Sequence, residues 1–311
     1  MALAFETAYG IPPASGYTRM PFASATLGAD QPLLQSELLG YGRDPLAPIK
    51  DALNADGDVV VPIDARAFGF WLKGAFGTPS SSEGEDGSGD PNGIFTHVFQ
   101  SGGWVLPSMS IEIGMPEVPS FTMYPGCRVD QLSFTMQRAG LLTATARLIP
   151  QGEKDPATSA QTGTLDTVEL LRFGHFNGAV KRDGTALANV VSCEVSYQNT
   201  LDRIETIRAD GLIDGADPGM AMLTGRMDVR FSDTTLLQQA IDGAPCALEF
   251  GWALPSGESL TITAHAVYLP RPRREINGPQ GVQASFEWQA ALDPILGRMC
   301  TVTLINDRSD Y

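Results

Sequence analysis

Two segments far apart in the chain carry the same residue pattern, and this repetition constrains the fold more than any other feature. Each segment follows a strand-like apolar run, at 59–63 and at 227–231. In both, an aspartate precedes an aliphatic residue by eight positions and a glycine by ten, and the two patterns are offset by 169 residues. The six positions are Asp64, Leu72 and Gly74 in the first copy and Asp233, Ile241 and Gly243 in the second. Solenoid repeats recur about every 20 to 50 residues, so this longer period predicts two fused copies of one domain.

The residue pattern of each half predicts a mainly β domain with one short flanking helix. Polar and apolar residues alternate over 131–136 and 143–148, which is the period-two pattern of half-buried strands. We expect the helices to begin at Asp64 and Asp233, because aspartate is a favoured N-cap residue. The expected elements of the first half are a helix over 64–76 and strands at 34–39 and 59–63 and at Phe95, Ser108, Arg128 and Leu142. Those of the second half are strands at 190–198, 227–231, 246–252, 259–267, 282–290 and 300–305.

The remaining stretches divide the chain into four parts. Residues 1–33 hold four prolines with several Gly and Ser, so they are expected to form an extended N-terminal arm that runs over a neighbouring surface. The first β unit is expected over 34–150, a polar linker over 151–170 and the second β unit over 171–311. Within the first unit, 78–93 has no apolar residue to anchor it and is expected to be a mobile tether.

The length and net charge of the chain limit the classes of function that it can have. At 311 residues the chain has room for about two domains of ordinary size. Its net charge is −15, from 36 acidic and 21 basic residues, which argues against a surface that grips duplex DNA through clustered Lys and Arg. The cysteines are spaced too widely for a zinc site or a small disulfide scaffold, so buried, reduced thiols are expected. The sequence has no signal-like start and no apolar run near about 18 residues, which predicts a cytoplasmic protein without a membrane segment.

A search for catalytic chemistry finds no complete set of residues. The three histidines are isolated, and no two have the i, i+4 spacing of a helical zinc site. Residues 210–217 resemble a calcium loop but lack the alternating acids and terminal glutamate of an EF-hand. Glu112, Glu249 and Glu287 could pair as the acid and base of a glycosidase, although outward-facing strand acids are far commoner. We therefore expect no enzyme activity, no metal and no cofactor.

The tryptophans leave one alternative function open. They could stack on sugars in a carbohydrate-binding or adhesin-type β-sandwich module. All four lie in or beside apolar segments, where core packing is the default. They are Trp71, Trp104, Trp252 and Trp288. A carbohydrate-binding module is therefore the second function class, and a β-sandwich hydrolase is the third.

Two short segments carry a resemblance to a known family. They are 106–114 (LPSMSIEIG) and 124–129 (YPGCRV), followed by the alternating strand through Phe134. With them, the chain resembles the tail tube, or major tail, proteins of long-tailed bacteriophages with flexible tails, in their long form, over most of residues 34–292. The resemblance implies two tandem tail-tube-like β-sandwich units, each with a short flanking α-helix. It further implies that their sheets line rings, which stack into a hollow tube through which DNA passes.

The resemblance assigns roles to two loops and one sheet face. The long loop before each helix, at 42–57 and 199–225, is expected to reach the next ring, and an ordinary surface loop is the alternative. The candidate inter-ring residues are Arg43, Asp44, Lys50 and Asp56 in the first loop and Arg203, Arg208, Asp210 and Asp214 in the second. Acids on lumen-facing strands would repel DNA phosphates. The candidate lumen-facing acids, chosen by alternation, are Glu112, Asp130, Glu249 and Glu287.

The repetition also sets the expected partners. If a ring contains six tube domains, three chains close it with pseudo-sixfold symmetry, and a hexameric ring of whole chains is the alternative. The resemblance implies further contacts with tape measure and terminator proteins, while genomic DNA passes through without specific binding. It places the protein in the virion tail after assembly in the host cytoplasm, with no membrane partner.

Overall fold

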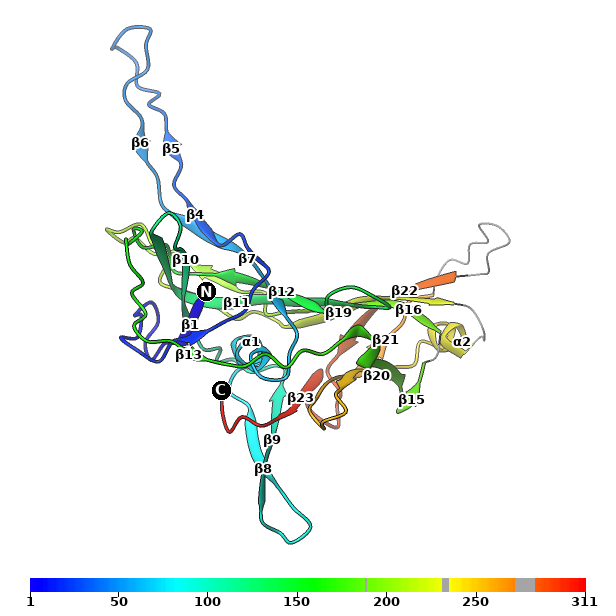
Figure 1. Ribbon diagram of the computed structural model, residues 1–311. Helices are drawn as coiled ribbons and strands as arrows, with labels where there is room; N and C mark the ends of the chain where they lie inside the picture. Colours follow the sequence, from blue (N-terminus) through cyan, green and yellow to red (C-terminus); the bar gives the residue numbers. More distant parts are fainter. Residues whose placement is uncertain (188, 231–234, 272–282) are drawn as a thin grey trace.

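The computed structural model describes residues 1–187, 189–230, 235–271 and 283–311 (Figure 1). The chain is mainly β, as the alternating segments predict, and its described part contains two short α-helices. No helix in these ranges has the length and apolar character needed to cross a bilayer.

The first half is a series of adjacent strands in which every pairing is antiparallel, and two short strands share the last place in the series. The pairing order is β1–β10–β11–β12–β7, with β3 and β4 sharing the outer edge of β7. Their bounds are Ala2–Phe5 for β1, Met109–Met115 for β10, Ser120–Gln137 for β11, Thr143–Ile149 for β12, Asn54–Pro62 for β7, Ser24–Ala25 for β3 and Gly28–Asp30 for β4.

The second half has the same antiparallel series. Its order is β14–β20–β21–β22–β19–β16. The bounds are Gly178–Arg182 for β14, Cys246–Ala253 for β20, Ser259–Tyr268 for β21, Gln283–Ala291 for β22, Met222–Arg230 for β19 and Val190–Gln198 for β16. Even an irregularity recurs, because the register shifts between Met109 and Ile111 in β10 and between Cys246 and Leu248 in β20. Such bulges are specific features of a sheet, so the two series match in detail.

The two halves join edge to edge within the chain. β11 pairs with β16 from Gln131 opposite Gln198 to Gln137 opposite Ser192. The result is one continuous sheet in the order β4–β7–β12–β11–β16–β19–β22. In Figure 1 this sheet forms the horizontal band, with α1, β20, β21 and α2 packed below it.

A helix follows β7 in the first half and β19 in the second half. α1 spans Phe68–Phe76 and α2 spans Thr235–Asp242. The first begins four residues later than predicted, because Asp64 caps the turn before it: its Oδ1 accepts the N–H groups of Arg66 at 2.8 Å and Ala67 at 2.7 Å. Asp233, the predicted cap of the second helix, lies outside the described residues.

A large apolar core lies between the sheet and the helix-bearing layer. Nearly all of α1 is buried, and the inward side chains of the sheet cover it. The largest side chains that are almost fully buried include Trp71, Phe68, Phe250, Trp252 and Phe286. The four cysteines are free and buried in this core.

The segment predicted to be a mobile tether is an ordered hairpin instead. β8, Ser80–Glu85, pairs with β9, Pro91–Gln100, and Asp86 closes the turn by accepting N–H groups from Ser88 and Asp90. β9 continues the second layer by pairing with β23, Cys300–Asn306, which also pairs with β21. A two-stranded ladder uses backbone hydrogen bonds and needs no apolar side chain, which is why composition hid it.

The first 33 residues contact their own chain rather than only extending from it. Leu3, Tyr17 and Met20 are buried, and the carboxylate of Glu6 accepts hydrogen bonds from Ser108, Ser110 and two backbone N–H groups. Short strands continue this layer: β2, Thr18–Arg19, pairs with β1 and with β13, Asp166–Thr167, while β15, Thr185–Ala186, pairs with β14.

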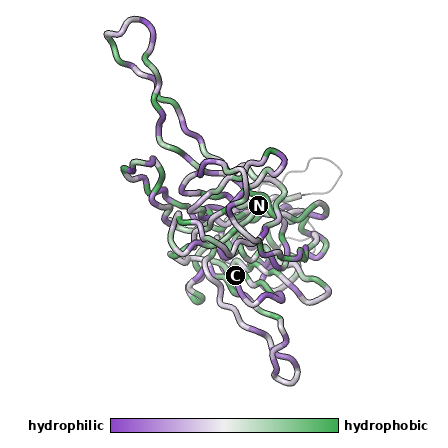
Figure 2. Tube along the Cα trace, turned by 60° about the vertical axis from the view of Figure 1, so that its left-hand side comes forward, coloured by the Kyte–Doolittle hydropathy of each residue, from purple (hydrophilic) through white to green (hydrophobic). Residues whose placement is uncertain are grey.

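The segment predicted as a strand at 34–39 is part of a protruding loop. Only β5, Leu33–Leu34, pairs there, with β6, Ile49–Lys50. We call this loop, residues 31–53, the arm; it overlaps the N-terminal arm predicted over 1–33 only at its first residues. The arm and the β8–β9 hairpin point in opposite directions from the body in Figures 1 and 2. The arm exposes many large apolar side chains: Leu33, Leu34, Leu38, Leu39, Tyr41, Leu46 and Ile49.

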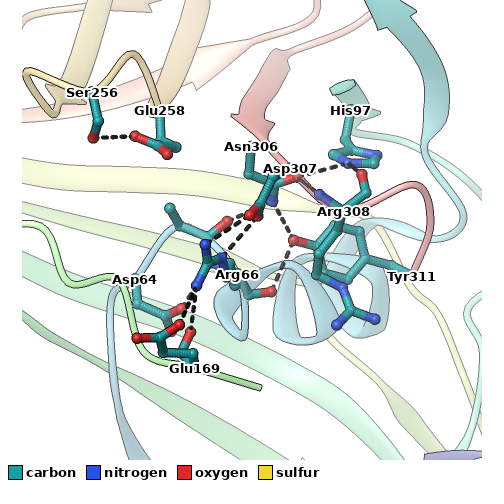
Figure 3. Close-up of polar contacts among 11 residues, drawn as sticks. Asp64, Arg66, His97, Glu169, Ser256, Glu258, Asn306, Asp307, Arg308 and Tyr311 are labelled. Carbon is teal, nitrogen blue, oxygen red and sulfur yellow. Dashed lines mark hydrogen bonds and ion pairs between the residues drawn. The ribbon is translucent and has the colours of Figure 1, made fainter. Parts of the chain in front are cut away.

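Residues near the C-terminal end clamp α1 to the second half (Figure 3). The Tyr311 hydroxyl donates to the carbonyl of Arg66 at 2.8 Å, and the guanidinium of Arg66 binds both carboxylate oxygens of Asp307. Asn306, which is fully buried, donates to the Ala65 carbonyl and the Tyr311 hydroxyl. These bonds tie β23 to the start of α1.

Candidate functional site

One face of the continuous sheet is polar from strand to strand, and we call it the polar face. It faces away from the helix-bearing layer. Along β11 the buried Leu132, Phe134 and Met136 alternate with Gln131, Ser133, Thr135 and Gln137 on this face, and the other strands follow the same rule. Its further members are Thr143, Thr145 and Arg147 on β12; Ser192, Glu194, Ser196 and Gln198 on β16; Thr224, Arg226, Asp228 and Arg230 on β19; and Ser285, Glu287 and Gln289 on β22.

Charged side chains on the polar face lie next to groups of opposite charge. Glu194, Arg226 and Glu287 lie in one row across three strands, because Arg226 is opposite Glu194 on β16 and opposite Glu287 on β22. Arg226 also pairs with Asp228 at 3.2 Å. Burial opposes ionisation of Asp228, but hydrogen bonds from Ser285, Ser192 and Arg226 together hold its pKa below the usual value. Asp58 on β7 lies opposite Arg147 on this face, and Asp130 pairs with Arg147 at 3.9 Å, so carboxylates outnumber the guanidinium groups of Arg147, Arg226 and Arg230.

The polar face is hollowed at its centre. A concavity of about 1100 Å³ is lined by Gln131, Thr135, Glu194, Arg226 and Glu287, among others. Leu141 and Tyr268 also border this hollow. A curved surface of Ser, Thr and Gln side chains offers many weak hydrogen-bonding groups and no concentrated charge.

The predicted lumen-facing acids do not share one surface. Glu287 lies on the polar face and lines the hollow. Asp130 sits at a register shift in β11, where it accepts the Leu201 N–H at 2.9 Å and pairs with Arg147 of the polar face at 3.9 Å. Glu112 is 4% exposed and accepts hydrogen bonds from the Gln161 N–H and the Thr162 hydroxyl, so it is turned into the protein. Glu249 lies on β20 in the other layer and pairs with Lys181 at 2.5 Å.

The two predicted inter-ring loops lie side by side at one end of the sheet. Arg203 donates to the Ala55 carbonyl and pairs with Asp56 at 3.0 Å, which joins their bases. Asp56 itself belongs to β7, because that strand begins at Asn54, before the predicted loop ends. Arg43, Asp44 and Lys50 are exposed on the arm.

The second loop is organised around one guanidinium group. It contains a small hairpin of β17, Asp202–Ile204, and β18, Gly215–Asp217. Arg208 binds Asp210 at 2.7 Å and also binds Asp214. Hydrogen bonds from Arg208 lower the pKa of Asp210 to about 2. Two of the three carboxylates of the calcium-like segment are engaged with this cation, and the third, Asp217, pairs with Arg128 at 3.7 Å.

The other candidate chemical groups are separate from one another. Glu112, Glu249 and Glu287 occupy β10, β20 and β22, and none of these strands pairs with another of the three. His97 is buried and bonded to Ser81, Asn306 and the Arg308 carbonyl. Within the ranges that the structure describes, no group of three or more His, Cys, Asp or Glu is arranged to hold a metal ion.

One tryptophan departs from the core packing predicted for all four. Trp71, Trp252 and Trp288 are buried, but Trp104 is 75% exposed in the loop between β9 and β10. Its neighbour Val105 is also exposed. An isolated indole offers one stacking surface, whereas the polar face extends over several strands.

The sequence matches one known protein family. The sequence profile of a family described as phage tail tube protein matches residues 1–290. The chain belongs to this family. No curated protein matches the sequence. Among solved structures, the di-domain ARO/CYC BexL from the BE-7585A biosynthetic pathway is 12% identical, with 81% of this chain and 85% of that chain covered, but its TM-score of 0.12 gives it no weight.

Membership in the tail tube family supports a structural role in the virion tail. The charged residues Glu194 and Arg226 of the polar face are not among the predicted site residues. The signal for this face was present in the alternating segments 131–136 and 143–148, whose polar members all belong to it.

Proposed function

We propose that this protein is the structural subunit of a phage tail tube and that its polar face lines the channel through which DNA passes. The observation that carries the proposal is the hollow polar face on a continuous sheet, on which carboxylates outnumber guanidinium groups, in a chain of the tail tube family. A wall with an excess of carboxylates offers no strong attraction to phosphates, so a long polyanion can slide along it.

The chain further consists of two copies of one tube unit, in the long form found in flexible-tailed phages. The proposal is supported by the matching pairing series of the halves and by the register shift that recurs in β10 and β20. Three chains then supply six units, which gives a trimeric ring with pseudo-sixfold symmetry. A ring with strict sixfold symmetry of whole chains contradicts this stoichiometry.

The arm and the second predicted loop, 199–225 up to the start of β19 at Met222, connect successive rings. They lie at the same end of the sheet, and the arm exposes apolar side chains such as Leu38, Leu39 and Tyr41 without covering them. A contiguous apolar surface on a soluble protein favours contact with another protein. Tape measure and terminator proteins are further partners of the assembled tube, which forms in the host cytoplasm.

Electron microscopy of the concentrated, purified protein tests the assignment. We expect rings or hollow tubes, with threefold symmetry in image averages. Monodisperse monomers that form neither rings nor tubes, alone or with the phage's other tail proteins, contradict it.

A further inference from the structure

Each half carries one long loop at the same place in its sheet. In the first half the arm leaves β4 and returns into β7, and in the second half residues 199–221 (the second loop) leave β16 and return into β19. Register shows that the places correspond: Ser24 is opposite Val60 on β7, and adding 168 to both numbers gives Ser192 opposite Asp228 on β19. The two loops are equivalent in topology but differ in what they contact.

The arm joins the body at a narrow base. Every residue of 31–50 except Ser36 is exposed. The base consists of the ladder between β4 and the start of β7, together with two hydrogen bonds. The Asp51 N–H donates to the Pro32 carbonyl at 2.9 Å, and the Gln31 side chain donates to the Asp51 carbonyl at 3.0 Å. The direction of the arm is therefore set by the groups that hold this base.

The second loop holds the base of the arm through Arg203. The Arg203 guanidinium donates to the Ala55 carbonyl at 3.2 Å and pairs with the Asp56 carboxylate at 3.0 Å. Both acceptors belong to the stretch of β7 that pairs with β4. Hydrogen bonds from a charged donor are stronger than those between neutral groups. One side chain of the second half thus binds two consecutive residues of the strand into which the arm returns.

The tip of the second loop reaches the arm itself. Gly211 has a φ of 69°, which glycine adopts without strain. A Cβ added at Gly211 would lie 3.6 Å from the Cα of Ala52, so the backbone of this turn lies against the returning chain of the arm. The next residue, Leu212, packs on the linker, because a Cβ added at Gly152 would lie 2.6 Å from its side chain. The tip therefore contacts both the arm and the linker.

The second loop is fixed to the first half near both of its ends. Near its start, the Leu201 N–H donates to the Asp130 carboxylate at 2.9 Å. Near its end, Arg128 binds the Ala216 carbonyl and pairs with Asp217 at 3.7 Å. Asp130 and Arg128 both belong to β11, so the loop is anchored on a central strand of the continuous sheet.

Arg208 gives the second loop a defined shape between these anchors. Its guanidinium binds Asp210 and Asp214, and the Thr206 hydroxyl donates to Asp214. The Asp214 N–H donates to the Ile204 carbonyl at 2.9 Å and extends the β17–β18 hairpin. A single exposed ion pair contributes little, but a network of several charges restricts a loop more strongly. The network therefore holds the tip in place against the arm.

We infer that the second loop is a brace that sets the direction of the arm, and that Arg203 is its positioning residue. Of the two equivalent loops, one projects from the body and the other holds it. The brace comes from the second half and the base of the arm from the first, so the direction of the arm depends on both halves. The brace is a property of the single chain, whereas its use in joining rings rests on the proposed function.

Distances between two spin labels test the brace in the full-length chain. One label is attached to the arm at Gln35→Cys and the other to the sheet at Thr135→Cys, and both positions are exposed. The four natural cysteines are buried and give little background. The labelled protein is diluted with unlabelled protein, so that only distances within one chain are measured. We expect a narrow distance distribution when the brace is intact.

Arg203→Asp turns the attraction to Asp56 into repulsion and should widen the distance distribution at least about twofold. The melting temperature should change little, because both side chains of this ion pair are partly exposed. Arg208→Gln loosens the brace without touching the arm and should widen the distribution as well. Arg138→Asp is the matched control, because it makes the same change of charge in the exposed turn between β11 and β12. It should leave the distribution unchanged.

Rescue variants separate the positioning role of Arg203 from a contribution to stability alone. Combining Arg203→Asp with Asp56→Arg restores the ion pair with its charges exchanged and should restore the narrow distribution. Arg203→Lys keeps the charge and should retain most of the narrow distribution.

The outcomes separate the brace from the tube function. A distribution that is already broad in the natural protein, or that neither Arg203→Asp nor Arg208→Gln widens, overturns the brace whether or not tubes form. If the arm joins rings, Arg203→Asp should give rings that stack into tubes at a lower yield, and the charge exchange should recover the yield. Tubes that form at the natural yield while the labels show a freed arm support the brace and contradict the role of the arm in joining rings.

Discussion

Replacing Gln289 with lysine places a positive charge on the polar face without disturbing the core. Gln289 is exposed and lies opposite Thr224 on β19, in a row whose next member is Ser196 on β16. No carboxylate shares this row to neutralise the new charge. The side chains are similar in length, so we expect the fold and the assembly to be retained.

The effect on DNA can be estimated from the number of new contacts. Each phosphate contact changes the logarithm of affinity by roughly 0.9 per logarithmic unit of salt, which is about a 3.5-fold change between 50 and 200 mM. A trimeric ring would present three new lysines. If all three contact phosphates, the attraction per ring is about 40-fold stronger at the lower salt concentration.

DNA ejection from phage assembled with the Gln289→Lys protein measures this attraction. We expect ejection to be slowed at 50 mM salt and nearly normal at 200 mM. Ser88→Lys adds the same charge to the β8–β9 turn, away from the polar face, and should leave the rate unchanged. If the two variants eject DNA at the same normal rate at low salt, the polar face does not line the DNA path.

Three further predictions concern the stability of the subunit. Burial raises the pKa of Asp64 to about 6, above its unfolded value. The ionised carboxylate therefore destabilises the fold above pH 6, and this destabilisation disappears below pH 4, where the group is protonated in both states. In denaturant titrations, the free energy of unfolding of the natural protein, compared with that of Asp64→Asn, should rise by up to about 3 kcal/mol from pH 7 to pH 4, and an unchanged difference between the two proteins refutes the assigned pKa. Replacing the turn 86–90 with a Gly-Ser link should shift the melting temperature by less than about 2 °C, whereas removing 78–93 also removes the Ser81–His97 hydrogen bond and should lower it by about 2 °C or more. Burial raises the thiol pKa values of Cys193 and Cys300 to about 12, so the native protein should resist thiol reagents at pH 8, and rapid labelling before unfolding contradicts the packing.

Strand positions in the second half could be predicted because alternation and sheet geometry share a period of two. The strand expected at 190–198 has those bounds in the structure. The other strands predicted in the second half all occur, and most of their ends lie within a few residues of the predicted positions. The start of α1 was placed too early, since the N-cap rule identifies a capping aspartate but not the length of the turn it closes. The β8–β9 hairpin was missed because its ladder is held by backbone groups that composition does not reveal.

The candidate site was harder to predict than the strands. Alternation separates the two faces of each strand but does not say which strands share a sheet. Glu112 and Glu249 are on strands that fold into other parts of the molecule, whereas Glu287 is on the polar face and Asp130 pairs with Arg147 of that face. Pairing of β11 with β16, 65 residues away along the chain at Gln131 and Ser196, creates that face, and such long-range pairing leaves no local signal.

The central claim is that the polar face lines a channel, and a reconstruction of the assembled tube at side-chain resolution tests it most directly. The account predicts that Gln131, Glu194, Arg226 and Glu287 project into the lumen while α1, α2 and the β8–β9 hairpin lie on the outer side. A tube whose lumen is lined by the helix-bearing layer, with the polar face buried between rings or turned to the outside, would contradict it.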